Sequence, residues 1–236
     1  MLGPSGSGKS FFMNHLVRQY WEQGTHVVLV DTGNSYQGLC EMIRSKTKGE
    51  DGIYFTYTEE KPISFNPFYT EDNQFDVEKK DSLKTLLLTL WKSEDDRISK
   101  TESGELGSAV DEYIKKIQTD RSIVPSFNTF YEFMRDEYKV ALKEREIEVS
   151  KADFNIDNLL TTLRQYYRGG RFDFLLNSDK ELDLLNKRFI IFEIDAIKEN
   201  RDLFPVVTII IMEAFINKMR RLKGIRKQLI VEEAWL

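Results

Sequence analysis

The chain has little cysteine or histidine and no long hydrophobic run. Its 236 residues include a single cysteine, Cys40, and two histidines, which excludes an internal disulfide framework and a cysteine-based zinc site. The longest strongly apolar stretch, Leu203 to Met212, is far shorter than the roughly 20 residues that span a bilayer. Acidic residues outnumber basic ones by 39 to 34, which argues against coating nucleic acid by bulk positive charge. The length fits one large domain, or one domain that carries an insertion.

The first ten residues contain a motif typical of phosphate binding. A glycine, four residues and Gly-Lys-Ser form the P-loop pattern, in which glycine backbone N–H groups curve around phosphate oxygens. Lys9 would reach the β- and γ-phosphates, and the Ser10 hydroxyl would bind Mg²⁺. The alternative is a flexible Gly/Ser loop before a helix. We predict ATP and Mg²⁺ as cofactors, and the residues expected to hold the nucleotide are Gly3, Pro4, Ser5, Gly6, Ser7, Gly8, Lys9, Ser10 and Phe11.

The residues after the P-loop support this interpretation. Apolar residues at helical spacing predict a helix over 11–21, which Gly24 ends. Residues 25–31 then read as a buried parallel strand that ends in Asp31. Asp31 either positions water or Mg²⁺, or is simply the polar residue that closes a buried strand. Only two residues precede Gly3, so the strand that normally leads into a P-loop is missing and we expect the chain to be a fragment.

The last ten residues form a short apolar strand followed by two carboxylates, which is the form of a Walker B segment. Glu232 would hold Mg²⁺ together with Ser10, and Glu233 would activate the attacking water, so that Lys9 and Glu233 are the predicted catalytic residues. Glu232 departs from the pattern, because aspartate is usual there. Taken alone, the segment also fits a surface strand end with solvated acids. The chain stops three residues after Glu233, so we expect truncation at this end as well.

Between the two motifs the sequence reads as an α/β unit, a long helical stretch and a second α/β unit. We predict a P-loop ATPase core from residues 1–69 and 186–236, with residues 70–185 as a helical insertion. The charged, glycine-containing residues 93–107 predict a mobile loop. The main expected elements are a strand over 52–57, an apolar helical stripe over 83–91, helices over 126–146 and 159–167, a strand over 188–195 and a helix over 202–222.

The chain resembles the TraG-type conjugation ATPases, the type IV secretion energisers of the FtsK/HerA P-loop superfamily. The P-loop alone names only a superfamily, and the ending Glu233-Ala234-Trp235 is more specific. The other residues that carry the resemblance are the strand ending at Asp31, Asn66-Pro67-Phe68, Leu163 through Gly170 with Phe174, and Phe192-Glu193-Ile194-Asp195.

The resemblance implies a RecA-like P-loop NTPase sheet with an all-helical insertion. It also implies a homo-hexamer at the cytoplasmic face of the inner membrane, attached to it only through the full-length protein. There, Mg-ATP hydrolysis would power assembly of the transfer apparatus, whose proteins would be partners, or movement of its substrates. Two alternatives remain open: a DNA translocase or helicase of the same superfamily, and an assembly module that binds ATP without turnover.

Three finer features allow two interpretations each. A basic cluster over 218–227 either compensates a helix dipole or contacts DNA, acidic lipid or a neighbouring subunit. Arg168 and Arg171 either lie in a plain turn or supply an arginine to a neighbouring subunit. The aromatic residues from Phe127 to Tyr138 are either helix packing, which we favour, or a base-stacking platform. The cluster consists of Lys218, Arg220, Arg221, Lys223, Arg226 and Lys227.

Overall fold

A computed structural model describes residues 8–57, 64–70, 74–93, 95–144, 153–178 and 184–232. The chain divides into two units. Unit 1 consists of Met1–Ile63 with Leu182–Leu236, and unit 2 of Ser64–Glu181. The two ends of the sequence therefore belong to one unit, and the middle of the chain forms the other.

Unit 1 contains a parallel four-stranded sheet with the order β2-β3-β1-β4. Its strands are β1 (His26–Asp31), β2 (Ile53–Thr56), β3 (Phe189–Glu193) and β4 (Lys227–Val231). In the registers, Val28 of β1 lies opposite Ile190 of β3 and Leu229 of β4. Every residue of β1 and β3 is buried, as expected for central strands of a parallel sheet that is covered on both faces.

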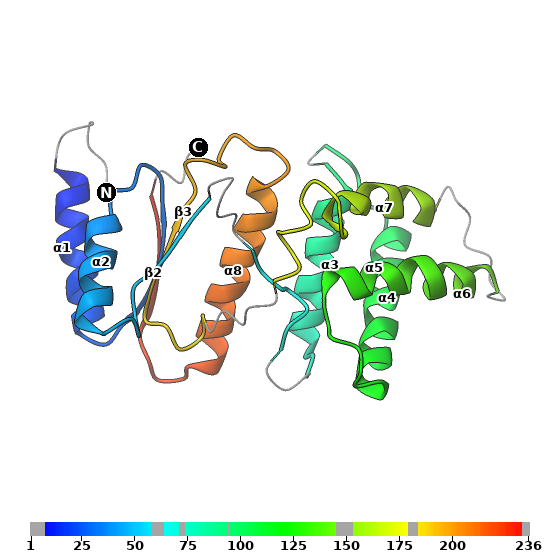
Figure 1. Ribbon diagram of the computed structural model, residues 1–236, viewed down its shortest axis with the longest axis horizontal. Helices are drawn as coiled ribbons and strands as arrows, with labels where there is room; N and C mark the ends of the chain where they lie inside the picture. Colours follow the sequence, from blue (N-terminus) through cyan, green and yellow to red (C-terminus); the bar gives the residue numbers. More distant parts are fainter. Residues whose placement is uncertain are drawn as a thin grey trace. The chain divides into compact units, whose positions relative to one another are not determined.

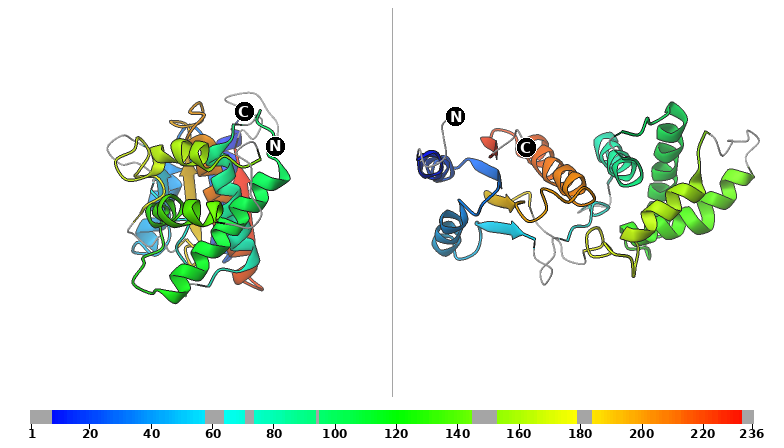
Figure 2. Two further views of the ribbon diagram at one scale, coloured as in Figure 1. Left: turned by 90° about the vertical axis from the view of Figure 1, so that its right-hand side faces the viewer. Right: turned by 90° about the horizontal axis from the view of Figure 1, so that it is seen from above.

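Helices cover both faces of this sheet. Figures 1 and 2 show α1 (Lys9–Glu22) and α2 (Gln37–Lys46) on one face and α8 (Phe204–Arg221) on the other. Pro205 stands in the first turn of α8, where its missing N–H costs no hydrogen bond. The core beneath α1 and α2 contains Val17, Trp21, Val27, Leu29, Tyr36, Cys40, Ile43, Phe189, Ile191 and Ile230. The predicted strands and helices of both ends are thus present, with boundaries shifted by a few residues.

At the amino end of the sheet, the buried carboxylate of Asp51 accepts hydrogen bonds from Trp21 in α1 and from Arg188, which precedes β3. Its Oδ2 accepts hydrogen bonds from Trp21 Nε1 at 3.1 Å and Arg188 Nε at 2.9 Å, and its Oδ1 accepts one from Arg188 N at 2.8 Å. The Arg188 guanidinium also lies over the Trp21 ring, 5.3 Å from its centroid. Burial alone would raise the pKa of Asp51, but the hydrogen bonds from Arg188 and Trp21 outweigh it and lower the pKa.

Lys218 differs from its expected place in a surface cluster. Its side chain on α8 is fully buried, and its Nζ donates to the backbone oxygens of Leu185 at 2.7 Å and Lys187 at 2.6 Å. Nζ also lies 3.4 Å from His26 Nδ1, and burial followed by the Lys218 charge lowers the pKa of His26 to about 4. A buried amine needs such acceptors, so Lys218 anchors the segment before β3 and is not available to DNA or lipid.

Unit 2 is helical in the part of the chain that the structure describes. Its elements, most of them labelled in Figure 1, are α3 (Val77–Trp91), α4 (Lys100–Thr119), α5 (Phe127–Phe133), the π-helical turn η1 (Met134–Tyr138), α6 (Lys139–Lys143), α7 (Ile156–Leu163) and the 3₁₀ turn η2 (Arg164–Tyr166). Ser126 caps α5 by accepting a hydrogen bond from Thr129 N. The large aromatic side chains of α5 and η1 are buried, which confirms the packing interpretation.

The mobile loop predicted over residues 93–107 is wrong in its second half. A capping box begins α4, because Ser99 Oγ accepts from Glu102 N while Glu102 Oε2 accepts from Ser99 N. Leu106 and Val110 are buried on the inner face of the helix. The two glycines of this segment are tolerated within α4, because tertiary packing outweighs their low helix propensity.

Candidate functional site

The P-loop meets α1 at Gly8. This glycine has φ +79°, in the left-handed region, and is the N-cap of the helix. Lys9, Ser10 and Phe11 are the first three residues of α1, and the Phe11 side chain is largely exposed. Residues 3–7 of the motif lie outside the described residues. The lysine and the hydroxyl therefore stand at the positive end of a helix dipole, where anions are stabilised.

Three carboxylates lie side by side at the carboxyl edge of the sheet. Asp31 ends β1 and pairs in register with Glu193, the last residue of β3. Glu232 follows β4, and its N–H donates to Val30 O at 3.0 Å, so it lies on the other side of β1. Ligands of open parallel sheets bind beyond this edge. Glu233, the predicted water-activating residue, lies outside the described residues.

Asp31 is the most deeply buried of the three acids, with 1% of its surface exposed. Its Oδ2 accepts a hydrogen bond from Ser35 N at 2.7 Å, whereas its Oδ1 has no hydrogen-bond partner within the described ranges. Burial, and then the charges of Glu193 and Glu232, raise the pKa of Asp31 to about 6. The fold thus keeps a poorly satisfied carboxyl at the centre of the edge, an arrangement more typical of functional sites than of structural ones.

Glu193 holds the loop between β1 and α2, residues 32–36. Its carboxylate accepts hydrogen bonds from Gly33 N at 3.2 Å, Asn34 N at 2.8 Å and Asp195 N at 3.0 Å. The Tyr54 hydroxyl donates to Asn34 Oδ1 at 2.9 Å. The sequence places Glu193 in a strand and among the residues that carry the family resemblance, but nothing local indicates that its carboxylate orders a loop 160 residues away.

The same loop contacts both predicted motifs. The Asn14 side chain, one turn into α1, donates from Nδ2 to Ser10 O at 2.9 Å and to Ser35 O at 3.0 Å. At the other end of the loop, the Tyr36 hydroxyl donates to Glu232 Oε1. The structure therefore connects the P-loop helix with the predicted metal ligand Glu232 through the loop. Sequence reasoning missed the roles of Asn14 and Tyr36.

The donor set suits the predicted Mg²⁺. Ser10 offers a hydroxyl and Glu232 a carboxylate, and oxygen donors are the ligands that Mg²⁺ prefers. Among residues placed by the structure, no three or more His, Cys, Asp or Glu side chains gather as an all-protein metal site would require. A P-loop site needs no such group, because phosphate and water complete the metal's coordination.

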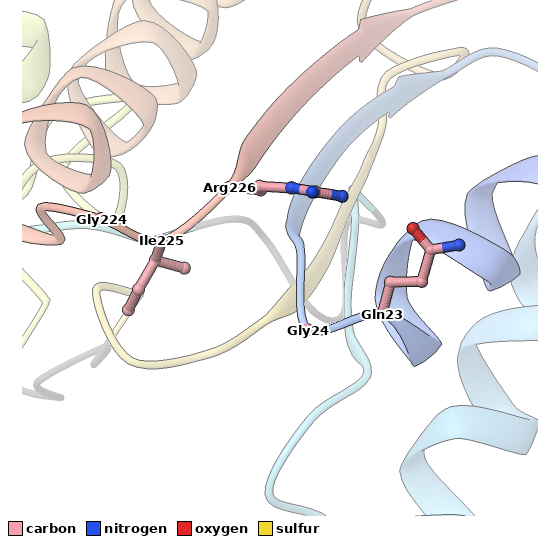
Figure 3. A pocket seen from close by; sticks show the side chains of 5 residues that line it. All are labelled: Gln23, Gly24, Gly224, Ile225 and Arg226. Carbon is pink, nitrogen blue, oxygen red and sulfur yellow. The ribbon is translucent and has the colours of Figure 1, made fainter.

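A surface pocket occurs at the opposite edge of the sheet. It is lined by Gln23, Gly24, Gly224, Ile225 and Arg226, from the end of α1 and the turn before β4 (Figure 3). These residues flank the amino ends of β1 and β4, where His26 N donates to Arg226 O at 2.9 Å. The pocket is therefore separate from the carboxyl edge that carries the three acids.

The two arginines considered for a neighbouring subunit lie in unit 2. Both Arg168 and Arg171 have exposed side chains. The guanidinium of Arg168 lies 3.9 Å from Glu132, and that of Arg171 lies over the Phe172 ring, 4.9 Å from its centroid. Their role at a subunit boundary stays a prediction.

Comparison with known proteins now decides the family. Residues 1–236 match the family described as the TraG P-loop domain. The chain belongs to the TraG P-loop domain family. The predicted kinship with conjugation and type IV secretion ATPases, and the predicted α/β P-loop fold, are both confirmed.

Proteins of conjugation and secretion systems match nearly the whole chain. Protein TraC of Escherichia coli (strain K12) is 22% identical over 235 residues, which cover 99% of this chain and 24% of TraC. The structure of VirB4 of Thermoanaerobacter pseudethanolicus matches with a TM-score of 0.63 and 20% identity, covering 99% of this chain and 59% of that one. The plasmid coupling protein TrwB, in complex with the ATP analogue ADPNP, matches with a TM-score of 0.57 and 14% identity. The match covers 98% of this chain and 55% of the TrwB chain.

The chain therefore spans about a quarter of TraC and little more than half of the VirB4 and TrwB chains. Within the residues that the structure places, none of the helices has the length and apolar character needed to cross a membrane.

Proposed function

We propose that this chain is the Mg-ATP-hydrolysing domain of a protein that energises a conjugative transfer or type IV secretion apparatus. The observation that carries the proposal is the link between the two end motifs. The loop 32–36 accepts a hydrogen bond from α1 through Asn14 and donates one to Glu232 through Tyr36. Tyr36 and Glu232, which are 196 positions apart in sequence, thereby meet at one edge of the sheet, where P-loop proteins bind nucleotide.

Each residue has a distinct task in this proposal. The amides of Gly3 to Gly8 hold phosphate, and Lys9 neutralises charge on the phosphoryl group that is transferred. Ser10 and Glu232 hold the metal ion, and Glu233 orients the attacking water and takes up its proton. Bound Mg²⁺ supplies charge neutralisation at the phosphate oxygens. Asp31 and Glu193 order the loop that lies between these groups.

Structural relatives support the choice of cofactors. TrwB has been determined with ADPNP and with ADP and Mg²⁺, at TM-scores of 0.57 and 0.52 to this chain. We propose the same ligand class here, since this chain has the P-loop and an acid after β4. We further propose that unit 1 is the ATPase core and unit 2 the helical insertion. Following the resemblance to the TraG-type ATPases, we also propose that the protein acts as a homo-hexamer at the cytoplasmic face of the inner membrane, beside the proteins of the transfer apparatus.

The experiment that tests the proposal compares the chain with its Lys9→Ala variant. Phosphate release from ATP is measured with Mg²⁺, and binding of a fluorescent ATP analogue is measured in parallel. We expect the unmodified chain to release phosphate and Lys9→Ala to abolish this release. The substitution removes the positive charge that neutralises the transferred phosphoryl group. Tight binding without phosphate release would favour the nucleotide-gated assembly module instead. A chain that neither binds the analogue nor releases phosphate would contradict the proposal.

A further inference from the structure

The Tyr36 side chain occupies two environments at once. Its ring belongs to the core beneath α1 and α2, and none of the residue is exposed. Its hydroxyl lies at the edge of that core and donates to Glu232 Oε1. Burial, and then the neighbouring Glu232 carboxylate, raise the pKa of Tyr36, so the hydroxyl stays protonated and remains a donor at any working pH.

Glu232 needs such a partner more than an aspartate would. Its side chain has one more rotatable bond than the aspartate usual at this position, and it is only half-buried. An unrestrained glutamate would sample several rotamers and lose entropy on binding a metal ion. The Tyr36 hydroxyl donates to Oε1, and the carboxylate keeps further lone pairs with which it can bind a metal ion. A fixed backbone supports this arrangement, since Glu232 N donates to Val30 O at 3.0 Å.

The tyrosine is itself held in place from two directions. It is the N-cap residue of α2, and its backbone oxygen accepts from Cys40 N at 3.0 Å. The preceding Ser35 is fixed by Asp31 Oδ2 on one side and by Asn14 Nδ2 on the other. A displacement of α1 at the P-loop would therefore be transmitted through this loop to the Tyr36 hydroxyl.

From these contacts we infer that Tyr36 is a positioning residue, which holds the Glu232 carboxylate in the orientation that binds Mg²⁺. Tyr36 contacts neither metal nor nucleotide in this role; it acts through Glu232. The inference rests on the proposed function, because it assigns Glu232 to the metal. Residues that orient a metal ligand typically contribute about 10- to 100-fold to metal affinity.

The test uses Tyr36→Phe, which keeps the ring in the core and removes only the hydroxyl. Tyr138→Phe is the matched control: Tyr138 is also fully buried, and its hydroxyl donates to a carboxylate, Glu105 Oε2 at 3.0 Å, but in unit 2. A fluorescent ATP analogue is titrated into each variant in EDTA and at a series of Mg²⁺ concentrations. We expect Tyr36→Phe to raise the Mg²⁺ concentration that gives half-maximal tight binding of the analogue about tenfold. The affinity of this variant for the analogue in EDTA should stay unchanged, and Tyr138→Phe should alter neither quantity.

A second comparison separates positioning from a general structural role. In a Glu232→Gln background, Tyr36→Phe should have no further effect on Mg²⁺ dependence, because the group through which it acts is already neutral. A Tyr36→Phe variant with wild-type Mg²⁺ dependence would overturn the inference alone. The inference would also be overturned if Tyr36→Phe still weakened the Mg²⁺ response about tenfold in the Glu232→Gln background, or if it weakened analogue binding equally in EDTA. Absence of Mg²⁺-dependent nucleotide binding in the unmodified chain would overturn the proposed function and the inference with it.

Discussion

Two buried aspartates at opposite edges of the sheet are expected to affect stability in opposite directions. Burial and neighbouring carboxylates raise the pKa of Asp31 to about 6, above the ordinary value of 3.8. The folded state then binds the Asp31 proton more tightly than the unfolded state does. Ionised Asp31 therefore lowers the free energy of unfolding above about pH 6, and this cost disappears as the pH falls below about 4.

The perturbation is Asp31→Asn, which removes the charge and keeps an acceptor for Ser35 N. A pKa shift of about two units corresponds to about 3 kcal/mol at high pH. Because the asparagine amide must also be buried, we expect a gain of about 1–3 kcal/mol in the free energy of unfolding at pH 7.5. The gain should fall by roughly two-thirds at pH 4.5, because folded Asp31 is almost fully protonated there and taking up that proton costs little at a pH close to the ordinary pKa of 3.8. Urea unfolding without nucleotide and in EDTA measures both values.

Asp51→Asn is the opposing control. Hydrogen bonds and the Arg188 charge lower the pKa of Asp51 despite its burial, so this carboxylate stabilises the fold above about pH 4 and the stabilisation is lost as the pH falls through the lowered pKa. We expect a loss of about 1.5–3 kcal/mol at pH 7.5, because asparagine cannot accept all of the hydrogen bonds from Arg188 and Trp21. If Asp31→Asn also destabilised the chain at pH 7.5, or stabilised it equally at both pH values, the reasoning from the acid cluster would be refuted.

Two further predictions concern packing, and both are read from urea unfolding midpoints. Lys218→Met should lower the free energy of unfolding by roughly 2–4 kcal/mol, because two partly buried backbone oxygens lose their donor. Lys223→Met on the exposed turn should leave it unchanged, and equal effects of the two substitutions would contradict the burial of Lys218. Gly52→Ala should lower the free energy of unfolding by more than about 2 kcal/mol, since φ is +82° and the new Cβ would lie 2.7 Å from Cys40 O. Gly104→Ala in the open interior of α4 should raise it by about 0.5–1 kcal/mol. A Gly52→Ala variant of unchanged stability would contradict this backbone conformation.

The strands and most helices could be predicted because their signals are local. Residues 27–30 are a continuous apolar run, and Pro205 with Gly224 marks both ends of α8. The start of α4 was not predicted, because charged residues and two glycines masked a capping box at Ser99. The strand order could not be read from the sequence either, since it depends on which strands meet after the whole chain has folded.

The charged residues of the candidate site could be predicted from the sequence, but the hydrogen bonds that connect them could not. Lys9, Asp31 and Glu232 follow from a motif and two strand ends. The contact between Tyr36 and Glu232 joins residues 196 positions apart, and an aromatic residue at a helix start gives no hint of it. Lys218 was wrongly assigned to the surface for a related reason. The basic residues that follow it, among them Arg220 and Arg221, are exposed, whereas its own side chain faces the buried side of α8.

The strand order has a consequence for how the chain is made. β1 and β2 are translated before β3 but do not pair with each other, because β3 lies between them and β4 pairs with the other side of β1. At 5–20 residues per second, a ribosome needs roughly 8–30 s to pass from Asp31 to Phe189. During that interval β3 and β4, the strands that pair with β1 within the described residues, have not yet been made, whereas the sequence-local helices of unit 2 are free to form. Synthesis of this chain should therefore depend on chaperones until β3 emerges, and truncation before residue 189 should give aggregates rather than a smaller folded domain.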